Sequence, residues 1–591
     1  MDRTGIIVVT ICVILLFLTW PEMPQRPQQP QPVTTSTNVV GTNVVQQPVQ
    51  PAAAPLPSTP GIKPSVELES EKLVTLETED SVYTFTSAGG LKTVGLNHHE
   101  AKPCSSTNQA DVIHLNLNHG VDLPVFSLNG LEDSEFSIDR DGGQVTMVST
   151  NQAGIRITKQ FVAGTNYLLH TSIKLENKGS ESAKLNPSKL VLGTAMPLRP
   201  DDTYPVWGTQ WHNGEDLEEI DEGWFANRTL GCFPGTPRAQ FVSPPQAPIN
   251  WVGVHNRFFA MTTMPKTQLP GARIHSQKTT NHRLLNDIPT EGQYVHHTGI
   301  LATLELPHSE LEAGSAVTLE FTTYAGPKEY RTLVAHGVAE NNSLQSVMGF
   351  DGFFGFFARV LLRSMNGLNG FGLSYAWSII AITIIIKILF WPLTKASTVS
   401  MKRMSAYQPQ MAEIREKYKS DPQKMNRKIM EFMREHKINP MGGCLPILIQ
   451  LPVFFGFFTM LRSAVELRGA EFLWICDLSE SDTVAHIFGF PINPMPMLMA
   501  VTMLVQARLT PTSPTMDPMQ QKMMKYMPLI FIVILYNFSS GLTLYWTVQN
   551  MLSILQTKLT RNIVVDVSDA NTANTALAKP IKAKPKNKRK K

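Results

Sequence analysis

Hydrophobic and polar positions divide the chain into stretches with different patterns. A run of apolar residues from Ile6 to Trp20 stands near the start of the chain. Between residues 65 and 330 apolar and polar residues alternate, as in Ile155–Phe161, which predicts β-strands with one buried face. From Phe371 to Leu555 long apolar segments dominate, and these predict membrane-spanning helices.

The alternating stretch predicts one large antiparallel β-sandwich at residues 65–335. Further alternating segments are Leu301–Leu306 and Val317–Phe321, and turn signals such as Ala88–Gly90 separate the expected strands. No ten-residue helical pattern interrupts them, which favours an all-β domain over an α/β domain.

The apolar start predicts a signal-anchor transmembrane helix at residues 1–20. No small-x-small cleavage site follows it, so an uncleaved anchor is favoured over a removed signal peptide. Residues 21–64 contain eleven prolines and seven glutamines, a composition that cannot bury a core. These residues are expected to form an extended linker.

Phenylalanines gather in the region 336–370, where Phe350–Leu362 has few charges. This pattern predicts an amphipathic helix in the membrane interface. A buried helix of the β domain is the alternative.

Five further apolar segments follow. The first three are long enough to cross about 30 Å of hydrocarbon, whereas the last two are short and can be re-entrant pieces or one kinked helix. The segments are Ala376–Leu393, Cys444–Leu461, Gly489–Val505, Pro528–Phe538 and Leu542–Leu555.

Positive charge decides between these topologies. If all six segments span and Met1 is cytoplasmic, the inside regions include Lys395–Gly443, with eleven Lys or Arg, and the tail from Lys558, with ten. The outside loop Arg462–Ile487 has two, beside five acidic residues. This asymmetry places both termini in the cytoplasm and the β domain outside it. Merging the last two segments would export the basic tail.

The basic loop 395–443 predicts an antiparallel pair of cytoplasmic helices. Residues 420–423 have the form of a capping box, which would start the second helix at Ser420. The apolar positions recur at helical spacing and form either a simple pairing surface or an adaptable surface for varied apolar segments. They are Met401, Met404, Met411, Ile414, Tyr418, Met425, Ile429 and Phe432.

Lys387 is a single charge inside the segment Ala376–Leu393. A charged side chain well inside a span costs about 2.5–3.5 kcal/mol, so it is expected to face protein, water or a partner. Lys395 lies eight residues further on, about 12 Å of helix, so snorkelling to the interface relieves the cost only in part. Thr383 lies one turn before Lys387 on the same helix face.

Other spans also carry polar side chains, and together these predict a wet cavity open to the cytoplasm, with Lys387 at its centre. For each residue alone, ordinary interhelical hydrogen bonding is the alternative. The residues are Gln450, Thr502, Gln506, Thr547, Gln549 and Asn550.

The rest of the chemistry predicts neither an enzyme nor a metal or cofactor site. The five cysteines include no CxxC pair, and Cys104 and Cys232 either pair outside the cytoplasm or stay unpaired. His98–Glu100, His296–His297 and Asp201–Asp202 lack ligand or triad spacing. The chain has no phosphate-binding Gly-Lys-Ser/Thr loop either.

The basic tail, residues 563–591, is too charged and proline-broken to fold alone. Its charge suits ribosomal RNA or anionic lipid headgroups.

Several strings resemble the YidC/Oxa/Alb insertases, in particular the Gram-negative type with a large periplasmic domain. They are Trp391–Lys395, Asn439–Pro452, Val465–Arg468, Asp517–Met524 and Ser540–Trp546. The resemblance implies an inner-membrane insertase and chaperone for nascent membrane proteins, working alone or with the Sec translocon and its accessory subunits. It also implies a core at 371–562 with five helices around a hydrophilic groove.

In that family an arginine usually stands in the groove, and Lys387 holds the matching position here. The resemblance adds Tyr545 and Trp546 to the expected groove residues, and many relatives have tyrosine where this chain has Trp546. It implies that the ribosome and the signal-recognition-particle receptor can bind the basic tail and hairpin. The β domain is similar to the sugar-mutarotase supersandwich, which is no reason to assign it catalysis.

Two other functions are alternatives. A secondary transporter would use Lys387 as a substrate or coupling site, but no paired inverted repeats are evident in the sequence. A membrane-tethered carbohydrate-binding protein would leave the C-terminal spans unexplained.

Overall fold

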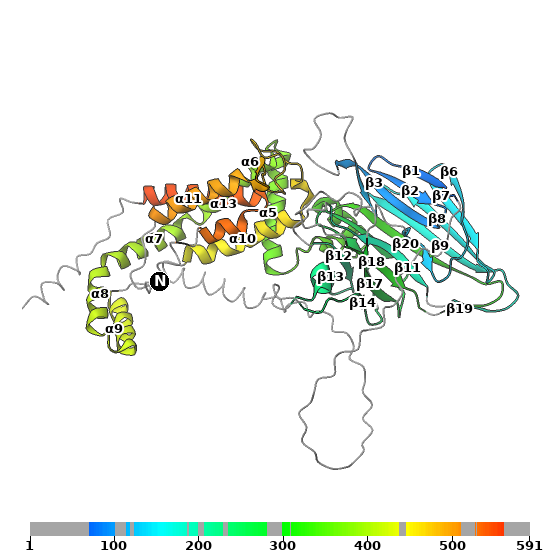
Figure 1. Cartoon of the computed structure of the whole chain (residues 1–591), viewed down its shortest axis with the longest axis horizontal. Coiled ribbons are helices and arrows are strands. Elements are labelled where there is room, and N and C mark those ends of the chain that lie inside the picture. Colours follow the sequence, from blue (N-terminus) through cyan, green and yellow to red (C-terminus); the bar gives the residue numbers. More distant parts are fainter. Residues whose placement is uncertain are drawn as a thin grey trace, which may run out of the picture. The chain divides into compact units, whose positions relative to one another are not determined.

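The structure is a computed structural model in which two compact units are resolved by their internal contacts (Figure 1). It describes residues 70–560 except 101–113, 119–122, 186–187, 199–205, 229–234, 247, 281–297, 308, 437–444, 510–525 and 527–528. The expected anchor, linker and basic tail lie outside the described residues. One unit, the β unit, runs to Gly349 and includes residues 462–466; the other, the helical unit, contains Phe350–Leu461 and the chain from Leu467.

The β unit is a large antiparallel sandwich. Its nine-stranded sheet has the order β13-β12-β15-β16-β20-β9-β8-β7-β6, and its five-stranded sheet the order β14-β17-β18-β11-β5. A four-stranded sheet, β1 to β4, completes it, and every named pair is antiparallel. The predicted β-sandwich is therefore confirmed.

The strands have the following bounds: β1 Leu73–Glu77, β2 Ser81–Thr86, β3 Gly90–Glu100, β4 His114–Leu117, β5 Leu128–Asn129, β6 Ser137–Asp141, β7 Gln144–Thr150, β8 Ile155–Ala163, β9 Leu168–Asn177, β10 Ala183–Leu185, β11 Lys189–Ala195, β12 Gly208–His212, β13 Leu217–Asp221, β14 Gln240–Val242, β15 Trp251–His255, β16 Phe259–Pro265, β17 Arg273–Thr280, β18 Thr298–Glu305, β19 Ser309–Leu311 and β20 Ala316–Pro327. β10 pairs with β19. The helices of this unit are α2 Glu222–Ala226, α4 Tyr330–Ala339 and the 3₁₀ turn η2 Leu344–Met348.

A charged pair lies in the core of the sandwich. Lys159 falls on an inward position of β8, where its neighbours Ile157 and Phe161 are also buried. Its ammonium bonds the fully buried carboxylate of Glu132 and donates to the carbonyl oxygen of Phe126 at 2.8 Å. Burial raises the pKa of Glu132 and lowers that of Lys159, because each charged form loses water.

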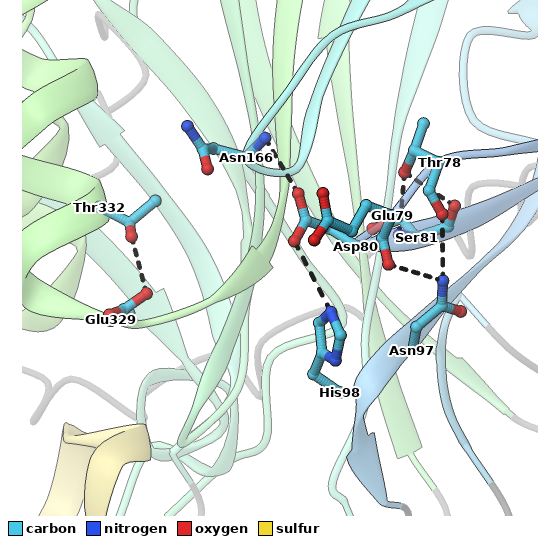
Figure 2. A network of polar contacts seen from close by, with 9 residues as sticks. All are labelled: Thr78, Glu79, Asp80, Ser81, Asn97, His98, Asn166, Glu329 and Thr332. Carbon is cyan, nitrogen blue, oxygen red and sulfur yellow. Dashed lines mark hydrogen bonds and ion pairs between the residues drawn. The ribbon is translucent and has the colours of Figure 1, made fainter.

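Polar contacts join the turns at one end of the β unit (Figure 2). Asp80, in the turn between β1 and β2, accepts the backbone N–H of Asn166 from the turn between β8 and β9, at 3.1 Å. His98 Nε2 lies 3.9 Å from the same carboxylate, and Asn97 donates to the carbonyl oxygens of Thr78 and Glu79. These contacts tie the four-stranded sheet to the nine-stranded one. His98 is more than half exposed and belongs to the surface, as expected.

The helical unit consists of helices and one small hairpin. Its elements are α5 Gly352–Gly370, α6 Tyr375–Leu389, α7 Trp391–Ala406, α8 Gln408–Lys417, α9 Pro422–Glu435, α10 Leu445–Ser463, the turn η4 Val465–Leu467, β21 Ala485–Ile487, β22 Phe490–Ile492, α11 Pro494–Leu509, a helix at 529–535 and α13 Ser540–Leu559. α13 packs against α6 and α11, and α5 packs against α6 (Figure 1). In the part of the chain that is described, only the bent pair α6 and α7 is long and apolar enough to cross a membrane.

Two expected spans differ from the observed helices. The segment Ala376–Leu393 is not one straight helix, because α6 ends at Leu389 and α7 leaves it at an angle of 60°. Pro392 explains this break, since a proline has no N–H to continue the helix and fits its first turn. The segment Gly489–Val505 begins as a hairpin strand, and α11 starts only at Pro494.

The expected pair of helices is formed by α8 and α9. The expected first helix is divided between α7 and α8, with Pro409 in the first turn of α8. The cap of α9 is Asp421 rather than Ser420, since its carboxylate accepts the N–H of Lys424 at 3.0 Å. Most of the predicted apolar positions do meet. The cluster contains Met404, Tyr407, Met411, Ile429 and Met433, with Ile414, Met425 and Phe432 against it.

Candidate polar site in the helical unit

Lys387 lies in the last turn of α6 and is 9% exposed. Its Nζ donates a hydrogen bond of 2.7 Å to the hydroxyl of Ser553 on α13. A cation in the last turn of a helix is favoured by the carbonyl groups that have no partner there. The lysine is therefore nearer a helix end than a straight span would place it, yet it is held inside the unit.

A chain of hydrogen bonds continues from Lys387 across α13 to α10. The Ser553 hydroxyl donates to the carbonyl oxygen of Gln549 at 2.8 Å, and the Gln549 amide donates to Gln450 Oε1 at 2.6 Å. Gln450 in turn donates to the Tyr545 hydroxyl at 3.1 Å. The chain joins α6, α13 and α10, and we call it the polar chain: Lys387, Ser553, Gln549, Gln450 and Tyr545.

The remaining predicted residues do not belong to the polar chain. Asn550 donates to the Thr502 hydroxyl at 3.2 Å and so joins α13 to α11. Thr383 and Thr547 are buried and donate to carbonyl groups four residues earlier in their own helices. Trp546 packs in an apolar cluster, with its ring 4.7 Å from that of Phe454. A groove open to the cytoplasm stays a prediction.

Sequence reasoning missed three polar residues on α13 and α7. Ser553 holds the lysine, and Gln556 donates to the Thr394 hydroxyl at 2.6 Å, which fastens α7 to α13. A signal for Ser553 was present, because Tyr545, Gln549 and Ser553 recur every four residues and so share one helix face.

The outer faces of the helices are apolar, the reverse of a water-soluble bundle. Each helix that contributes to the polar chain, and also α11 and the helix at 529–535, exposes large apolar side chains. They include Ile384, Ile385, Ile388 and Leu389 on α6, Leu448, Leu451 and Phe455 on α10, Val501, Leu504 and Val505 on α11, Val533 and Ile534 at 529–535, and Met551, Leu555 and Leu559 on α13. Polar groups inside and apolar groups outside are the arrangement that a lipid environment requires.

Cys476, in the loop between α10 and α11, forms a disulfide. Cys104 and Cys232, for which pairing and non-pairing were both left open, lie outside the described residues. Within the described ranges no group of His, Cys, Asp and Glu has the arrangement of a metal site. A pocket of about 460 Å³ in the β unit is lined by Arg273 and by His275 and Glu305, whose side chains are hydrogen-bonded to each other.

In this chain a large β-sandwich is followed by helices with a polar interior and an apolar exterior. This combination defines a membrane protein with an extramembrane domain. Residues 367–567 match the family model of the 60Kd inner membrane protein, and residues 122–363 match that of the YidC periplasmic domain. The chain belongs to the YidC family of membrane protein insertases.

Curated relatives named membrane protein insertase YidC agree with this family. The one from Geobacter sulfurreducens is 34% identical over 70% of each chain, and that from Geotalea daltonii is 30% identical over 87% of this chain and 91% of its own. The crystal structure of an active YidC insertase with its first transmembrane domain resolved has 18% identity and a TM-score of 0.33, over 84% of this chain and 94% of that one. The transporter alternative finds no support in these matches.

Proposed function

We propose that this chain inserts nascent inner-membrane proteins into the bilayer and helps them fold, using the polar chain as the place where a client's hydrophilic flank is held. The observation that carries the proposal is the Lys387 ammonium bonded to Ser553 inside helices whose outer faces are apolar. A buried cation whose partner is a neutral hydroxyl keeps a net positive charge for an acidic client group.

The mechanism follows from this charge. An acidic residue in the client's flank replaces Ser553 as the partner of Lys387, and the neighbouring amides bond the client backbone. The client's apolar part then moves into lipid along the exposed faces of α10 and the helix at 529–535. Burial of apolar surface and the membrane potential drive the transfer without a chemical step. Lysine supplies a point charge rather than the planar fork of an arginine.

The topology proposed is six spans with both termini in the cytoplasm and the β unit in the periplasm. The uneven distribution of Lys and Arg supports it. The disulfide of Cys476 gives independent support, because disulfides persist in the periplasm and are rare in the cytosol. Cys476 lies in the loop that the charges assign to the outside.

The proposed partners are nascent chains, the Sec translocon, the ribosome and the signal-recognition-particle receptor. The basic helices α8 and α9 and the basic tail 563–591 support the last two, since ribosomal RNA attracts clustered cations. Deleting residues 579–591 is expected to weaken co-sedimentation with ribosomes. Undiminished binding would favour anionic lipid as the tail's target.

The test of the main proposal replaces Lys387 by alanine and, as a matched control, by arginine. Each purified variant is reconstituted in proteoliposomes with a client that has a short acidic translocated tail, and with the same client carrying amides in place of its acids. Lys387→Ala is expected to impair insertion of the acidic client, and Lys387→Arg to preserve it. Unchanged insertion by the alanine variant would show that the charge is dispensable.

A further inference from the structure

The loop between α10 and α11 carries two tight turns whose tips are apolar and exposed. In the first, Phe472 and Ile475 exchange backbone hydrogen bonds of 2.7 and 2.8 Å, and Leu473 at the tip is 77% exposed. The second is the hairpin of β21 and β22, where Ile487 pairs with Phe490 and Phe488 at the tip is fully exposed.

Both tips place a bulky side chain where the backbone disfavours it. Leu473 has φ of 54° and Phe488 has φ of 51°, in the left-handed region. Gly489, which follows Phe488, has φ of 79°, so this hairpin turn has positive φ at both central residues. Asparagine or glycine is the usual choice at such positions, and a large apolar residue there is an outlier. The side chain is therefore kept for a reason other than forming the turn.

The bases of the two turns are fastened, so the tips project from a fixed support. Asp482 accepts the Trp474 indole N–H at 2.9 Å and the N–H of Met495 in the first turn of α11 at 2.6 Å. The Tyr536 hydroxyl donates to the carbonyl oxygen of Pro491 at 2.6 Å. The first turn is thus connected to the start of α11, and the second to Tyr536, directly after the helix at 529–535.

The surroundings of the tips point to lipid. Residues 483–492 contain no Asp, Glu, Lys or Arg, and exposed Val484, Ile487 and Phe490 extend the apolar surface of the hairpin. The Phe472 ring contacts that of Trp377, which is exposed on the first turns of α6, at 5.7 Å between centroids. The apolar exposed face then continues along α11. Tryptophan and tyrosine side chains, like that of Trp377, gather where spans leave the hydrocarbon.

We propose that the Leu473 and Phe488 tips are two wedges that enter the headgroup and acyl boundary of the outer leaflet and hold the extracytoplasmic end of the helical unit at a fixed depth. The occupant of this surface is the lipid bilayer. The inference rests on the proposed topology, in which the loop between α10 and α11 faces the periplasm.

A photo-crosslinking phenylalanine analogue, p-benzoylphenylalanine, tests the contact when it replaces Phe488 in the full chain. Glu471, exposed in the same loop, is the matched control position. Proteoliposomes of synthetic phosphatidylcholine are irradiated, and the intact protein is weighed by mass spectrometry. An adduct of one lipid is expected with the analogue at position 488, and no adduct is expected with the analogue at position 471. A crosslink from 488 to another part of the chain, or no adduct, would overturn the proposal.

A second experiment uses a double variant that keeps the turns intact. Asparagine tolerates the left-handed region, so Leu473→Asn with Phe488→Asn retains the fold and removes the apolar tips. Backbone hydrogen exchange of residues 484–492 in proteoliposomes is expected to accelerate in this variant and to stay unchanged in Glu471→Asn. Equal exchange in all proteins contradicts the wedge. If lipid adducts form but insertion does not depend on Lys387, only the proposed function is refuted and the wedge proposal stands.

Discussion

Lys387 on α6 and Ser553 on α13 are joined by a hydrogen bond of 2.7 Å from the ammonium to the hydroxyl oxygen. In the proposed mechanism an acidic client group replaces this bond. Removing the hydroxyl is therefore expected to favour client binding.

Ser553→Ala is expected to bind a client with an acidic flank about 5- to 10-fold more tightly. The hydrogen bond that it removes from the charged lysine contributes about 1.5–3 kcal/mol to the client-free protein, and a bond to water replaces part of this contribution. Crosslinking yield from a stalled nascent chain, titrated against each variant, measures the change. Ser553→Thr is the control that keeps the hydroxyl. Weaker client binding by the alanine variant would mean that Ser553 orients the lysine towards the client.

Gln450 and Gln549 form the middle of the polar chain, with 2.6 Å between amide nitrogen and oxygen. Gln549→Leu leaves the Gln450 oxygen without this donor and is expected to lower the free energy of unfolding by about 1–3 kcal/mol. The double variant with Gln450→Leu is expected to recover part of that loss while insertion falls. Thermal unfolding in detergent, beside the proteoliposome assay, separates the two effects. A double variant that inserts normally would limit the polar chain to a structural role.

Lys159 and Glu132 form a fully buried pair in the sandwich. Lys159→Met alone leaves the buried Glu132 carboxylate without its partner and is expected to lower the free energy of unfolding by about 3–5 kcal/mol. Lys159→Met with Glu132→Leu is expected to regain most of this loss. Unfolding of the β unit in the full chain, followed by near-ultraviolet circular dichroism, gives the comparison. Equal destabilisation by the single and double variants would show that packing, rather than charge, dominates this position.

Lys328, at the end of β20, is buried and its Nζ lies 3.0 Å from His255 Nδ1. Burial lowers the pKa of Lys328 from 10.5 to about 7. Between pH 7 and 10.5 the unfolded chain binds more protons at this residue than the folded one, so the stability of the β unit is expected to rise with pH across that window. Melting temperatures of Lys328→Met should show a flatter dependence. An unchanged slope of melting temperature against pH would show that Lys328 is not the cause of the pH dependence.

Cys476 is expected to resist alkylation by a maleimide in intact spheroplasts until a reductant is added. A membrane-impermeant maleimide should then label it, because the loop faces outward in the proposed topology. Cys476→Ser is the control for labelling at other cysteines. Labelling that needs membrane permeabilisation would reverse the assignment of this loop.

The alternation of residues such as those in Ile155–Phe161 is enough to predict the β-sandwich, because a strand with one buried face has to repeat every two residues. The polar chain was predicted in part. Lys387, Gln450 and Gln549 stand out because a polar side chain is rare in an apolar segment, and Tyr545 was added by the family resemblance. Ser553 does not stand out, since serine is small and common in helices.

The helix boundaries were less predictable for a physical reason. Hydropathy averages over a window, so it does not register the single proline at 392 that ends α6, nor the turn at Phe488 that makes the start of an apolar segment a hairpin. Trp546 was placed in the expected groove by the family resemblance. Its ring packs towards Phe454 because helical rotation turns it 100° from Tyr545.

The 60° break after Leu389 makes α7 a lever with its pivot three residues beyond Lys387. The described contacts of α7 include the bond from Gln556 to Thr394, near the pivot, and the bond of 2.6 Å from Lys402 to the carbonyl oxygen of Thr560, nearer the far end. Because Lys387 lies on the α6 side of this break, a rotation of α7 about the pivot would carry α8 and α9 with it and leave the lysine in place.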